Sequence, residues 1–389
     1  MLAGQKITVL GAGIGGLAAA TALAMRGADV RVLEQADSIQ EVGAGLQISP
    51  NGVCILDALG LGAQARARAV RSHGVRLKDG LSGRNVLHLD FDNPPRDDPF
   101  LMFHRADLVD LLARGARQAG VNIVTGARVE QVVPLDRGAR IDIAGQGGEE
   151  VDFLVGADGL HSVLRPALNG TRQPFFTHQV AWRTLIRATG AEPHEATVYM
   201  GPGCHLVAYP LRGGEIINIV AVQERRTWAD EGWFHQDDPE NLRAAFRAMG
   251  DEVQALLARV DQVHLWGLFR HPVALEWHKG RTALLGDAAH PTLPFMAQGA
   301  VMALEDAWVL ADCLEKMGLE DGPALYQARR RSRVVRVIEA ANKNARNYHY
   351  SNPLLRFAGH NALRVAGLLA PGRVLDRFDW IYSHDVTKG

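Results

Sequence analysis

Residues 6–17 read Lys-Ile-Thr-Val-Leu-Gly-Ala-Gly-Ile-Gly-Gly-Leu, close to the N-terminus of the chain. The mostly apolar run at 6–10 predicts a buried strand, and the alanine-rich segment that continues to Arg26 predicts a helix after the glycine turn. A second strand is expected at 29–33 and ends at Glu34, about 20 residues after the turn. A glycine turn in this strand–helix–strand context is typical of a dinucleotide site.

The positions within the turn have distinct physical roles. Gly11 allows the tight turn, Gly13 lets a pyrophosphate approach the backbone, and Gly16 lets the helix pack closely on the strand. The acid Glu34 lies where a ribose hydroxyl needs an acceptor. NAD and FAD both bind to this unit, so the turn alone leaves the dinucleotide open.

A second glycine-rich stretch, 286–300, follows an apolar strand expected at 282–285. Its acid, Asp287, can accept a hydrogen bond from a sugar hydroxyl of a cofactor. The small residues Gly299 and Ala300 open a helix whose N–H groups favour an anion. Taken alone, the stretch could be an ordinary turn before a helix. A third turn, Asp158-Gly159, repeats the combination of acid and glycine after a strand expected at 152–155.

The composition excludes several classes of protein. The 389 residues carry a net charge of -1, and no basic run suggests a nucleic-acid partner. No apolar run is long enough to span a membrane, and a strand at the start of the chain leaves no room for a secretory signal. Three cysteines, Cys54, Cys204 and Cys313, are far apart, so we expect no disulfide framework, no zinc site and a reducing cytoplasmic location.

The three cofactor motifs, in this order, resemble the single-component FAD-dependent aromatic hydroxylases with the para-hydroxybenzoate hydroxylase fold. The resemblance covers nearly the whole chain. Within this family the sequence is most similar to salicylate hydroxylase, 3-hydroxybenzoate 6-hydroxylase and 6-hydroxynicotinate 3-monooxygenase. The shared features are the loop 43–45, the pair His104-Arg105, the stretch 204–210 and the segment 296–300.

The resemblance implies a role for each matched position. The turn glycines would hold the FAD pyrophosphate, Glu34 the adenosine ribose with Gln35 beside it, and the Val129 backbone the adenine. Arg105 would reach the flavin, Asp287 the ribityl or pyrophosphate region, and the backbone of 298–300 the flavin edge. The cofactor-binding set is thus Gly11, Gly13, Gly15, Gly16, Glu34, Gln35, Arg105, Val129, Asp158, Asp287, Pro294, Gln298, Gly299 and Ala300. NADH or NADPH, with no second Rossmann motif to bind it, would be a transient co-substrate alongside O₂.

The family resemblance also fixes the expected architecture. The fold class is α/β, with a Rossmann-like FAD-binding domain, an inserted antiparallel β-sheet substrate domain and C-terminal helices. The FAD-binding domain is expected at 1–73, 101–178 and 271–350, the substrate domain at 74–100 and 179–270, and a helical segment at 351–389. Single helices are expected at about 239–258 and 323–346, and a hairpin at 74–92.

The implied activity is hydroxylation of a hydroxylated aromatic acid such as salicylate, by way of a flavin C4a-hydroperoxide. Its catalytic candidates are His205 as the base, Tyr209 on the same strand face, and Gln47 in the glycine-rich loop. This chain has Pro294 where 3-hydroxybenzoate enzymes tend to have Gln, and Gln47 where the 6-hydroxynicotinate enzyme has His, so the substrate stays open.

The alternatives to a salicylate hydroxylase fall into several classes. A 3-hydroxybenzoate or 6-hydroxynicotinate type enzyme, or a hydroxylase of a quinone precursor, would use the same site. An FAD oxidoreductase without oxygenation would use the cofactor alone, and a flavin-binding regulatory protein would catalyse nothing. The expected partners are a small aromatic substrate and, in a homodimer, a second copy of the chain.

Overall fold

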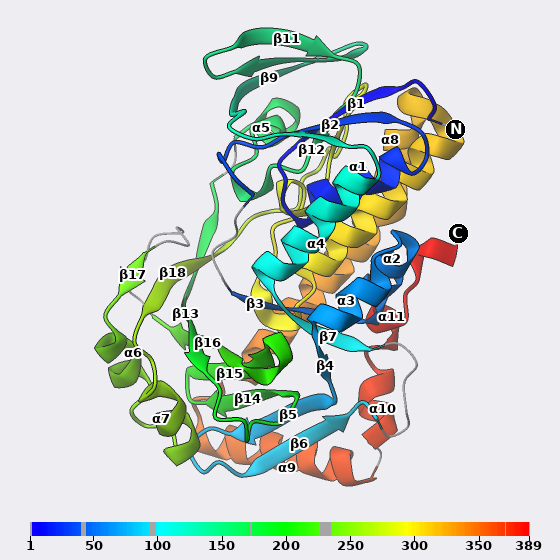
Figure 1. Cartoon of the computed structure of the whole chain (residues 1–389). Helices are drawn as coiled ribbons and strands as arrows, with labels where there is room; N and C mark the ends of the chain where they lie inside the picture. The colour runs from blue at the N-terminus through cyan, green and yellow to red at the C-terminus, as the bar shows by residue number, and fades with distance from the viewer. Residues whose placement is uncertain are drawn as a thin grey trace.

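The computed structural model of the chain describes residues 2–39, 44–92, 99–171, 173–225, 235–369 and 371–388. A parallel sheet with the strand order β19-β12-β1-β2-β8 forms one half of the molecule (Figure 1). Its strands are β1 (Lys6–Leu10), β2 (Asp29–Leu33), β8 (Asn122–Val124), β12 (Leu154–Gly156) and β19 (Thr282–Leu284). Gly11, Glu34, Asp158 and Asp287 all follow the carboxyl ends of these strands, where parallel sheets bind ligands.

Helix α1 (Ile14–Ala24) packs between α4 (Arg105–Gln118) and α8 (Gly299–Asn347) on one face of this sheet. Helix α8 contains both the helix expected to open at Gly299 and Ala300 and the helix expected at 323–346. The chain bends within it at Gly318, which has a φ of 76°, and Pro323 lies a few residues beyond the bend. The start expected at 323 was wrong. Pro323 lies in the first turn after the bend, where proline is tolerated, so it does not begin the helix.

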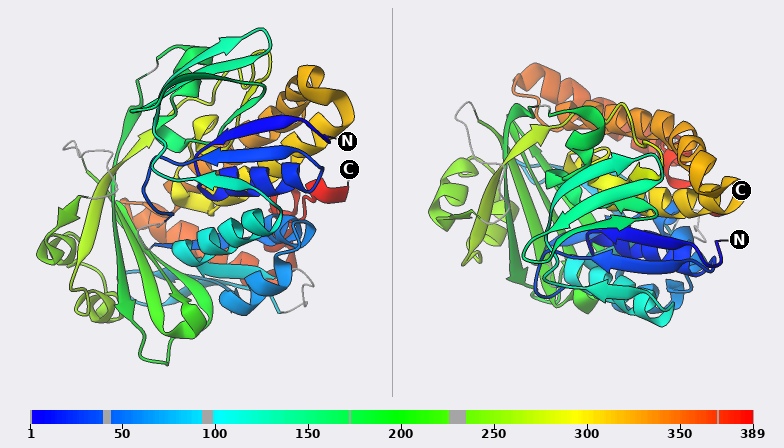
Figure 2. Two further views of the ribbon diagram at one scale, coloured as in Figure 1. Left: turned by 45° about the horizontal axis from the view of Figure 1, so that its top comes forward. Right: turned by 90° about the horizontal axis from the view of Figure 1, so that it is seen from above.

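A large mixed sheet forms the other half, with the order β17-β18-β13-β16-β15-β14-β5-β6. Figure 2 shows these strands, mostly green, to one side of the blue strands of the parallel sheet. The strands are β5 (Gly74–Asp79), β6 (Asn85–Asp90), β13 (Phe175–Arg187), β14 (Glu195–Gly201), β15 (Cys204–Leu211), β16 (Ile216–Glu224), β17 (Gln236–Asp237) and β18 (Val263–Arg270). The pairings are antiparallel except that of β5 with β14, because the β5–β6 hairpin joins the sheet from a distant part of the chain.

The segment expected as one helix at about 239–258 forms two, α6 (Pro239–Ala245) and α7 (Asp251–Leu257). They are separated at Gly250, whose N–H donates to Gly80 O at 2.8 Å. A Cβ at that position would lie 2.7 Å from Leu81 O, so the backbone of this break packs directly on the β5–β6 turn.

Smaller elements join and cover the two halves. A sheet of β3 (Gly45–Ile48), β7 (Phe100–His104) and β4 (Val70–Ser72) links them, and α2 (Pro50–Ala58) and α3 (Gly62–Arg68) lie between β3 and β4 in the chain. A sheet of β9 (Val129–Leu135), β10 (Gly138–Ile143) and β11 (Gly147–Val151) lies at the top of Figure 1. The remaining helices are α5 (Leu164–Asn169), α9 (Pro353–Leu369), α10 (Pro371–Asp376) and α11 (Asp379–Tyr382).

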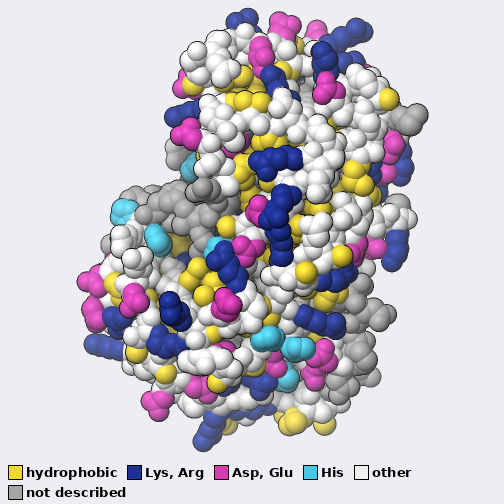
Figure 3. Space-filling view, viewed as in Figure 1, with side chains coloured by type: hydrophobic (Ala, Val, Ile, Leu, Met, Phe, Trp, Pro, Cys, Tyr) yellow, Lys and Arg dark blue, Asp and Glu magenta, His cyan; other side chains and the backbone are white. Residues whose placement is uncertain are grey.

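Positive and negative side chains are interspersed over the face shown in Figure 3. Among the described residues, no helix is both long and apolar enough to cross a bilayer.

Candidate active site

The glycine turn after β1 has the geometry that its sequence predicts. Gly11 has a φ of +94°, and a Cβ there would lie 2.6 Å from Ala157 O. At Gly16 a Cβ would lie 2.0 Å from Gly11 O, so helix and turn touch through backbone atoms. A Cβ at Gly13 would meet no described protein atom within 4 Å. Gly13 therefore borders the open space that a pyrophosphate needs, and the turn fits FAD.

Gly15, which the resemblance places at the pyrophosphate, also lies at a close packing contact. A Cβ at Gly15 would lie 2.7 Å from Leu285 Cδ1 and 3.2 Å from Ala303 Cβ. The absence of a side chain at this position brings α1 close to the glycine-rich stretch after β19 and to α8, while the residue still lines the cavity described below.

The adenosine end of the expected site lies at the ends of β2 and β9. The Glu34 carboxylate accepts hydrogen bonds from Ala12 N at 2.7 Å and Ala36 N at 2.9 Å, which ties it to the glycine turn. A carboxylate has further lone pairs, so Glu34 can also accept from a ribose. Gln35 is exposed beside it, and Val129 is half-buried at the start of β9.

A cavity of about 290 Å³ lies between the cofactor turns and the large sheet. Ten predicted site residues line it: Gly13, Gly15, Gln47, Arg105, His205, Tyr209, Asp287, Pro294, Gly299 and Ala300. Seven do not: Gly11, Gly16, Glu34, Gln35, Val129, Asp158 and Gln298. The cavity therefore brings the three catalytic candidates together with the flavin side of the expected cofactor site.

Two acids near the cavity have hydrogen-bonding capacity that a cofactor could use. Burial raises the pKa of Asp287, an effect that His290 and Arg105 partly offset. Burial also raises the pKa of Asp158, whose Oδ2 accepts from Val163 N at 2.8 Å. Its Oδ1 is buried and has no hydrogen-bond partner within the described part of the chain. Hydroxyl donors of a bound FAD would satisfy such atoms.

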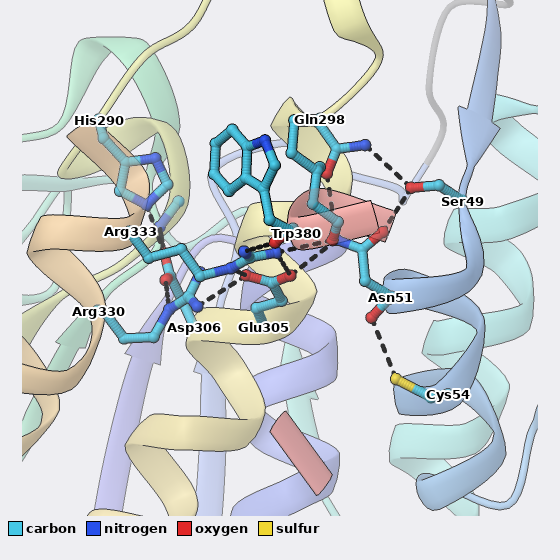
Figure 4. A network of polar contacts seen from close by, with 12 residues as sticks. Ser49, Asn51, Cys54, His290, Gln298, Glu305, Asp306, Arg330, Arg333 and Trp380 are labelled. Atoms are coloured by element: carbon cyan, nitrogen blue, oxygen red, sulfur yellow. Dashed lines mark hydrogen bonds and ion pairs between the residues drawn. The ribbon is translucent and has the colours of Figure 1, made fainter. Parts of the chain in front are cut away.

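The side chain of Gln298 belongs to a buried polar network (Figure 4) and does not line the cavity. Its Nε2 donates to Ser49 Oγ at 2.9 Å, and its Oε1 accepts from Asn51 Nδ2 at 3.1 Å. Asn51 also donates to Glu305 Oε1 at 2.7 Å. We call the whole set the loop network: Ser49, Asn51, His290, Gln298, Glu305, Asp306, Arg330 and Arg333. It joins both ends of the loop 290–298 to α2 and α8.

The large sheet supplies the opposite wall of the cavity. His205, Val207 and Tyr209 alternate along β15 with their side chains on one face, as a strand period of two requires. Val207 pairs with Val220, which pairs in turn with Arg183, so Arg183 lies across the same wall. The Arg183 guanidinium carbon stacks 4.8 Å from the centre of the Trp266 ring.

Burial gives His205 and Tyr209 opposite protonation behaviour. Burial, assisted by His349, lowers the pKa of His205 well below its ordinary value, so its ring is uncharged at neutral pH and can accept a proton. Burial raises the pKa of Tyr209 despite the opposing charge of Arg183, so its hydroxyl stays protonated. Tyr209 can therefore donate a hydrogen bond but cannot act as the base.

The structure describes the loop that carries Gln47 from residue 44 onward. Residue 43 lies outside the described residues, whereas Gly45 begins β3 and its N–H donates to Asn218 Oδ1 at 2.7 Å. Gln47 is half-buried on β3 and lines the cavity.

Arg183 was missed in the sequence because a cation within a strand does not show which face it occupies until the strand register is known.

Comparisons with known proteins show the family to which the chain belongs. The family described as "FAD binding domain" matches residues 5–341. The 3-hydroxybenzoate 6-hydroxylase of Polaromonas naphthalenivorans (strain CJ2) is 34% identical, over 98% of this chain and 96% of its own. The 3-amino-4-hydroxybenzoate 2-monooxygenase PtmB3 of Streptomyces platensis is 33% identical, with the same coverage of 98% and 96%. The structure of Klebsiella pneumoniae HpxO with FAD and uric acid has a TM-score of 0.82 at 27% identity, over 94% of each chain.

The fold, the cofactor turns and these matches define an FAD-dependent flavoprotein with the para-hydroxybenzoate hydroxylase fold. The chain belongs to the family of FAD-dependent aromatic hydroxylases, and it is an aromatic monooxygenase of that family. The resemblance found in the three sequence motifs is therefore confirmed.

Proposed function

We propose that this protein hydroxylates a hydroxylated aromatic carboxylic acid, such as salicylate or 3-hydroxybenzoate, with NADH or NADPH and O₂ as co-substrates. One observation carries the proposal: His205 and Arg183 lie on the same wall of a cavity whose other wall carries the cofactor turns. A base and a cation on one wall match the two polar groups of such a substrate, a ring hydroxyl and a carboxylate.

The rest of that wall suits an aromatic ring. Between and around the two polar side chains lie Val207, Val220 and Val222, and the loop before α8 adds Leu293 and Phe295. An apolar lining excludes water from the reacting groups and strengthens the electrostatic contacts inside the cavity.

The residues divide the chemistry among them. Reduced FAD, when bound, supplies oxygen from O₂ in an electrophilic form. His205 accepts the proton of the substrate hydroxyl, which makes the ring more electron-rich. Arg183 binds the carboxylate, and Tyr209 and Gln47 offer hydrogen bonds that orient the ring. The sequence has one dinucleotide fingerprint, which FAD would occupy. NADH or NADPH would therefore have no binding domain of its own and would bind only transiently to reduce the flavin.

The division of the chain follows from these roles. The FAD-binding domain would comprise 1–73, 101–178 and 271–350, and the substrate domain 74–100 and 179–270. The segment 351–389 would form a C-terminal helical unit that contributes to neither binding site directly.

A panel of aromatic acids tests the proposal. Purified holoenzyme is incubated with NADH or NADPH and salicylate, 3-hydroxybenzoate, 3-amino-4-hydroxybenzoate or 6-hydroxynicotinate, and oxygen uptake and product are measured together. At least one member should yield a hydroxylated product in proportion to NAD(P)H consumed. NAD(P)H oxidation with only hydrogen peroxide formed throughout would favour an oxidoreductase without oxygenation. Bound FAD with no turnover at all would favour a flavin-binding regulatory protein.

The assignment of Arg183 has its own test. Arg183→Met keeps most of the side-chain length but loses the charge-assisted hydrogen bonds to a carboxylate, which are each worth about 1.5–3 kcal/mol. We expect KM for the aromatic acid to rise roughly 10- to 100-fold with a smaller change in kcat. Arg187→Met, on the exposed end of the same strand, is the matched control and should leave both constants near wild type. An unchanged KM in Arg183→Met would exclude Arg183 as the carboxylate anchor.

A further inference from the structure

A chain of hydrogen-bonding groups leads from the cavity wall to the protein surface behind it. His205 Nδ1 lies 2.6 Å from His349 Nε2, and His349 Nδ1 lies 3.0 Å from Glu224 Oε1. Both rings are buried, with 3% and 5% of their surface exposed, whereas 52% of the Glu224 side chain is exposed. The three residues come from β15, the segment after α8, and the end of β16.

The carboxylate at the outer end sets the tautomer of each ring in turn. An ionised carboxylate can only accept, so His349 carries its proton on Nδ1 and leaves Nε2 as an acceptor. His205 must then carry its proton on Nδ1, which leaves its Nε2 without a proton for a group in the cavity. Gln179 Nε2 also lies near His349 Nδ1, but at 3.5 Å this contact is at the limit of a hydrogen bond and is the weaker of the two.

The proposed function creates a need for such a chain. A phenol that ionises in a closed apolar cavity has to pass its proton to the solvent, and the product hydroxyl has to take one back. Burial lowers the pKa of both His205 and His349, so neither ring holds an extra proton for long at neutral pH. Because His205 would accept a proton in every turnover, it needs a route by which that proton reaches the solvent.

We propose that His349 and Glu224 relay protons between His205 and the solvent during catalysis; this inference rests on the proposed function. The substrate O–H bond breaks as its proton binds His205 Nε2. The His205 Nδ1 proton then passes to His349 Nε2, and the His349 Nδ1 proton passes to the Glu224 carboxylate, which releases it to water. The net change is one phenolate and one proton in solution, with both rings in their other tautomers. The reverse sequence protonates the product and resets the rings.

Two substitutions of Glu224 can distinguish proton transfer from a role that only positions His349. The His349 backbone is held independently, since Gly203 N donates to His349 O at 3.3 Å. Glu224→Gln keeps the length and an acceptor oxygen for His349 but removes the basic carboxylate. Glu224→Asp shortens the side chain but keeps that basicity. A contact that only holds His349 in place is preserved better by Gln, whereas a proton acceptor is preserved better by Asp.

The experiment measures proton release without turnover. Oxidised holoenzymes, checked for bound flavin by absorbance, are mixed with the panel acid that the wild type hydroxylates best, and phenolate formation is followed in the near ultraviolet by stopped flow. We expect Glu224→Gln and His349→Gln to slow the release on the order of tenfold or more, and Glu224→Asp to lie between them and the wild type. The effect should be smaller than loss of the base itself, because water can partly replace an exposed carboxylate.

A control and two outcomes complete the test. Asp92→Asn removes the carboxylate of another exposed histidine pair, His73 Nδ1 with Asp92 Oδ2 at 2.6 Å, and should leave the rate unchanged. A wild-type rate in Glu224→Gln, or a faster rate in Gln than in Asp, would overturn the relay while the proposed function stands. If the wild type hydroxylates no panel member, the proposed function itself fails.

Discussion

The two polar networks that approach the cavity from opposite sides differ in where they end. In the loop network, Glu305 and Asp306 are fully buried and face Arg330 and Arg333, so two acids balance two guanidinium groups deep in the protein. The chain His205–His349–Glu224 contains no such balance and ends at an exposed carboxylate. A buried, charge-balanced network fixes a shape, whereas a chain with one end in water can exchange protons.

The pKa values follow the same division. Burial opposes ionisation of Asp306, but His290 and Arg330 outweigh it and lower the pKa of Asp306 to about 2. Arg330 and Arg333 likewise outweigh burial at Glu305 and lower its pKa. These acids therefore stay ionised across the physiological pH range. At His205 and His349, burial lowers the pKa, and Glu224 offsets this only in part at His349, so both rings are neutral.

The largest expected effect comes from removing the cofactor itself. Gly13→Val should give a folded but colourless protein, because a Cβ there meets no described protein atom within 4 Å and would project into the expected pyrophosphate space. The flavin absorbance of the purified protein and its far-ultraviolet circular dichroism measure the two properties. As a contrast, Gly16→Ala places a Cβ 2.0 Å from Gly11 O and should disturb the fold itself. A yellow Gly13→Val protein with normal FAD content would contradict the placement of the pyrophosphate.

Loss of the base should be the next largest effect, and it should fall on hydroxylation alone. His205→Ala should bind FAD and be reduced by NADH in the presence of substrate, while the hydroxylation rate falls on the order of 10²–10⁴-fold. NADH consumption should then yield hydrogen peroxide instead of product. Raising the pH toward the pKa of a free phenol, about 10, should partly restore the coupling of NADH consumption to product formation. His264→Ala, a histidine on β18 that does not line the cavity, is the control. Wild-type coupling at neutral pH in His205→Ala would remove this residue from the mechanism.

Breaking the loop network should cost stability. Arg330→Met removes the buried cation that Glu305 and Asp306 share, which leaves Glu305 with Arg333 and Asp306 with His290, and breaking a buried ion pair typically costs about 3–5 kcal/mol. We expect the urea midpoint of the holoenzyme, measured with excess FAD, to fall clearly. Arg329→Met, one residue earlier, loses a half-exposed pair with Asp312, a kind of contact worth about 0–1 kcal/mol, and should barely move the midpoint. Equal shifts in the two variants would mean that the loop network is not a source of stability.

The sequence predicted the cofactor side better than the sheet side, for a physical reason. At Gly11 a φ of +94° and a backbone contact demand one residue type, so the local pattern is enough. The period of two likewise placed His205 and Tyr209 on one face of β15 without any knowledge of the partners of that strand.

The unpredicted features depend on contacts between distant segments. His349 meets His205 across 144 residues, and nothing in the sequence near either ring indicates the other. Arg183 reaches the cavity wall only through the register of β13 with β16. The parallel pairing of β5 with β14 was missed for the same reason, since each strand looks the same in either direction.

The smallest expected effect lies farthest from both networks, on the C-terminal helix α9. We expect the segment 354–380 to cover the substrate sheet or a second copy of the chain. One face of α9 packs on the β5–β6 hairpin, where His360 Nδ1 lies 3.2 Å from Asp79 Oδ2 and Arg364 Nε donates to Asn85 O at 3.1 Å. The outer face exposes 79% of Leu354 and 69% of Phe357, one helical turn apart, and an apolar face of this kind favours a partner.

Truncation after Asn352 tests the segment. It also removes the Ile381 carbonyl, which accepts a hydrogen bond from Arg333 Nη2 at 3.0 Å. Because this damages the loop network, we expect the truncated chain to be less soluble. The double substitution Leu354→Glu and Phe357→Glu is sharper, because both side chains are exposed and a folded monomer tolerates charge there. If two copies pair through this face, the variant should show the mass of a monomer by light scattering while the wild type shows a dimer, with FAD content and coupling unchanged. Met317→Glu, which places a charge on an exposed apolar side chain of α8 instead of α9, should leave the wild-type mass unchanged. A wild type that is itself monomeric, or a double variant that stays dimeric, would rule out pairing through α9 and leave this helix as a cover for the sheet alone.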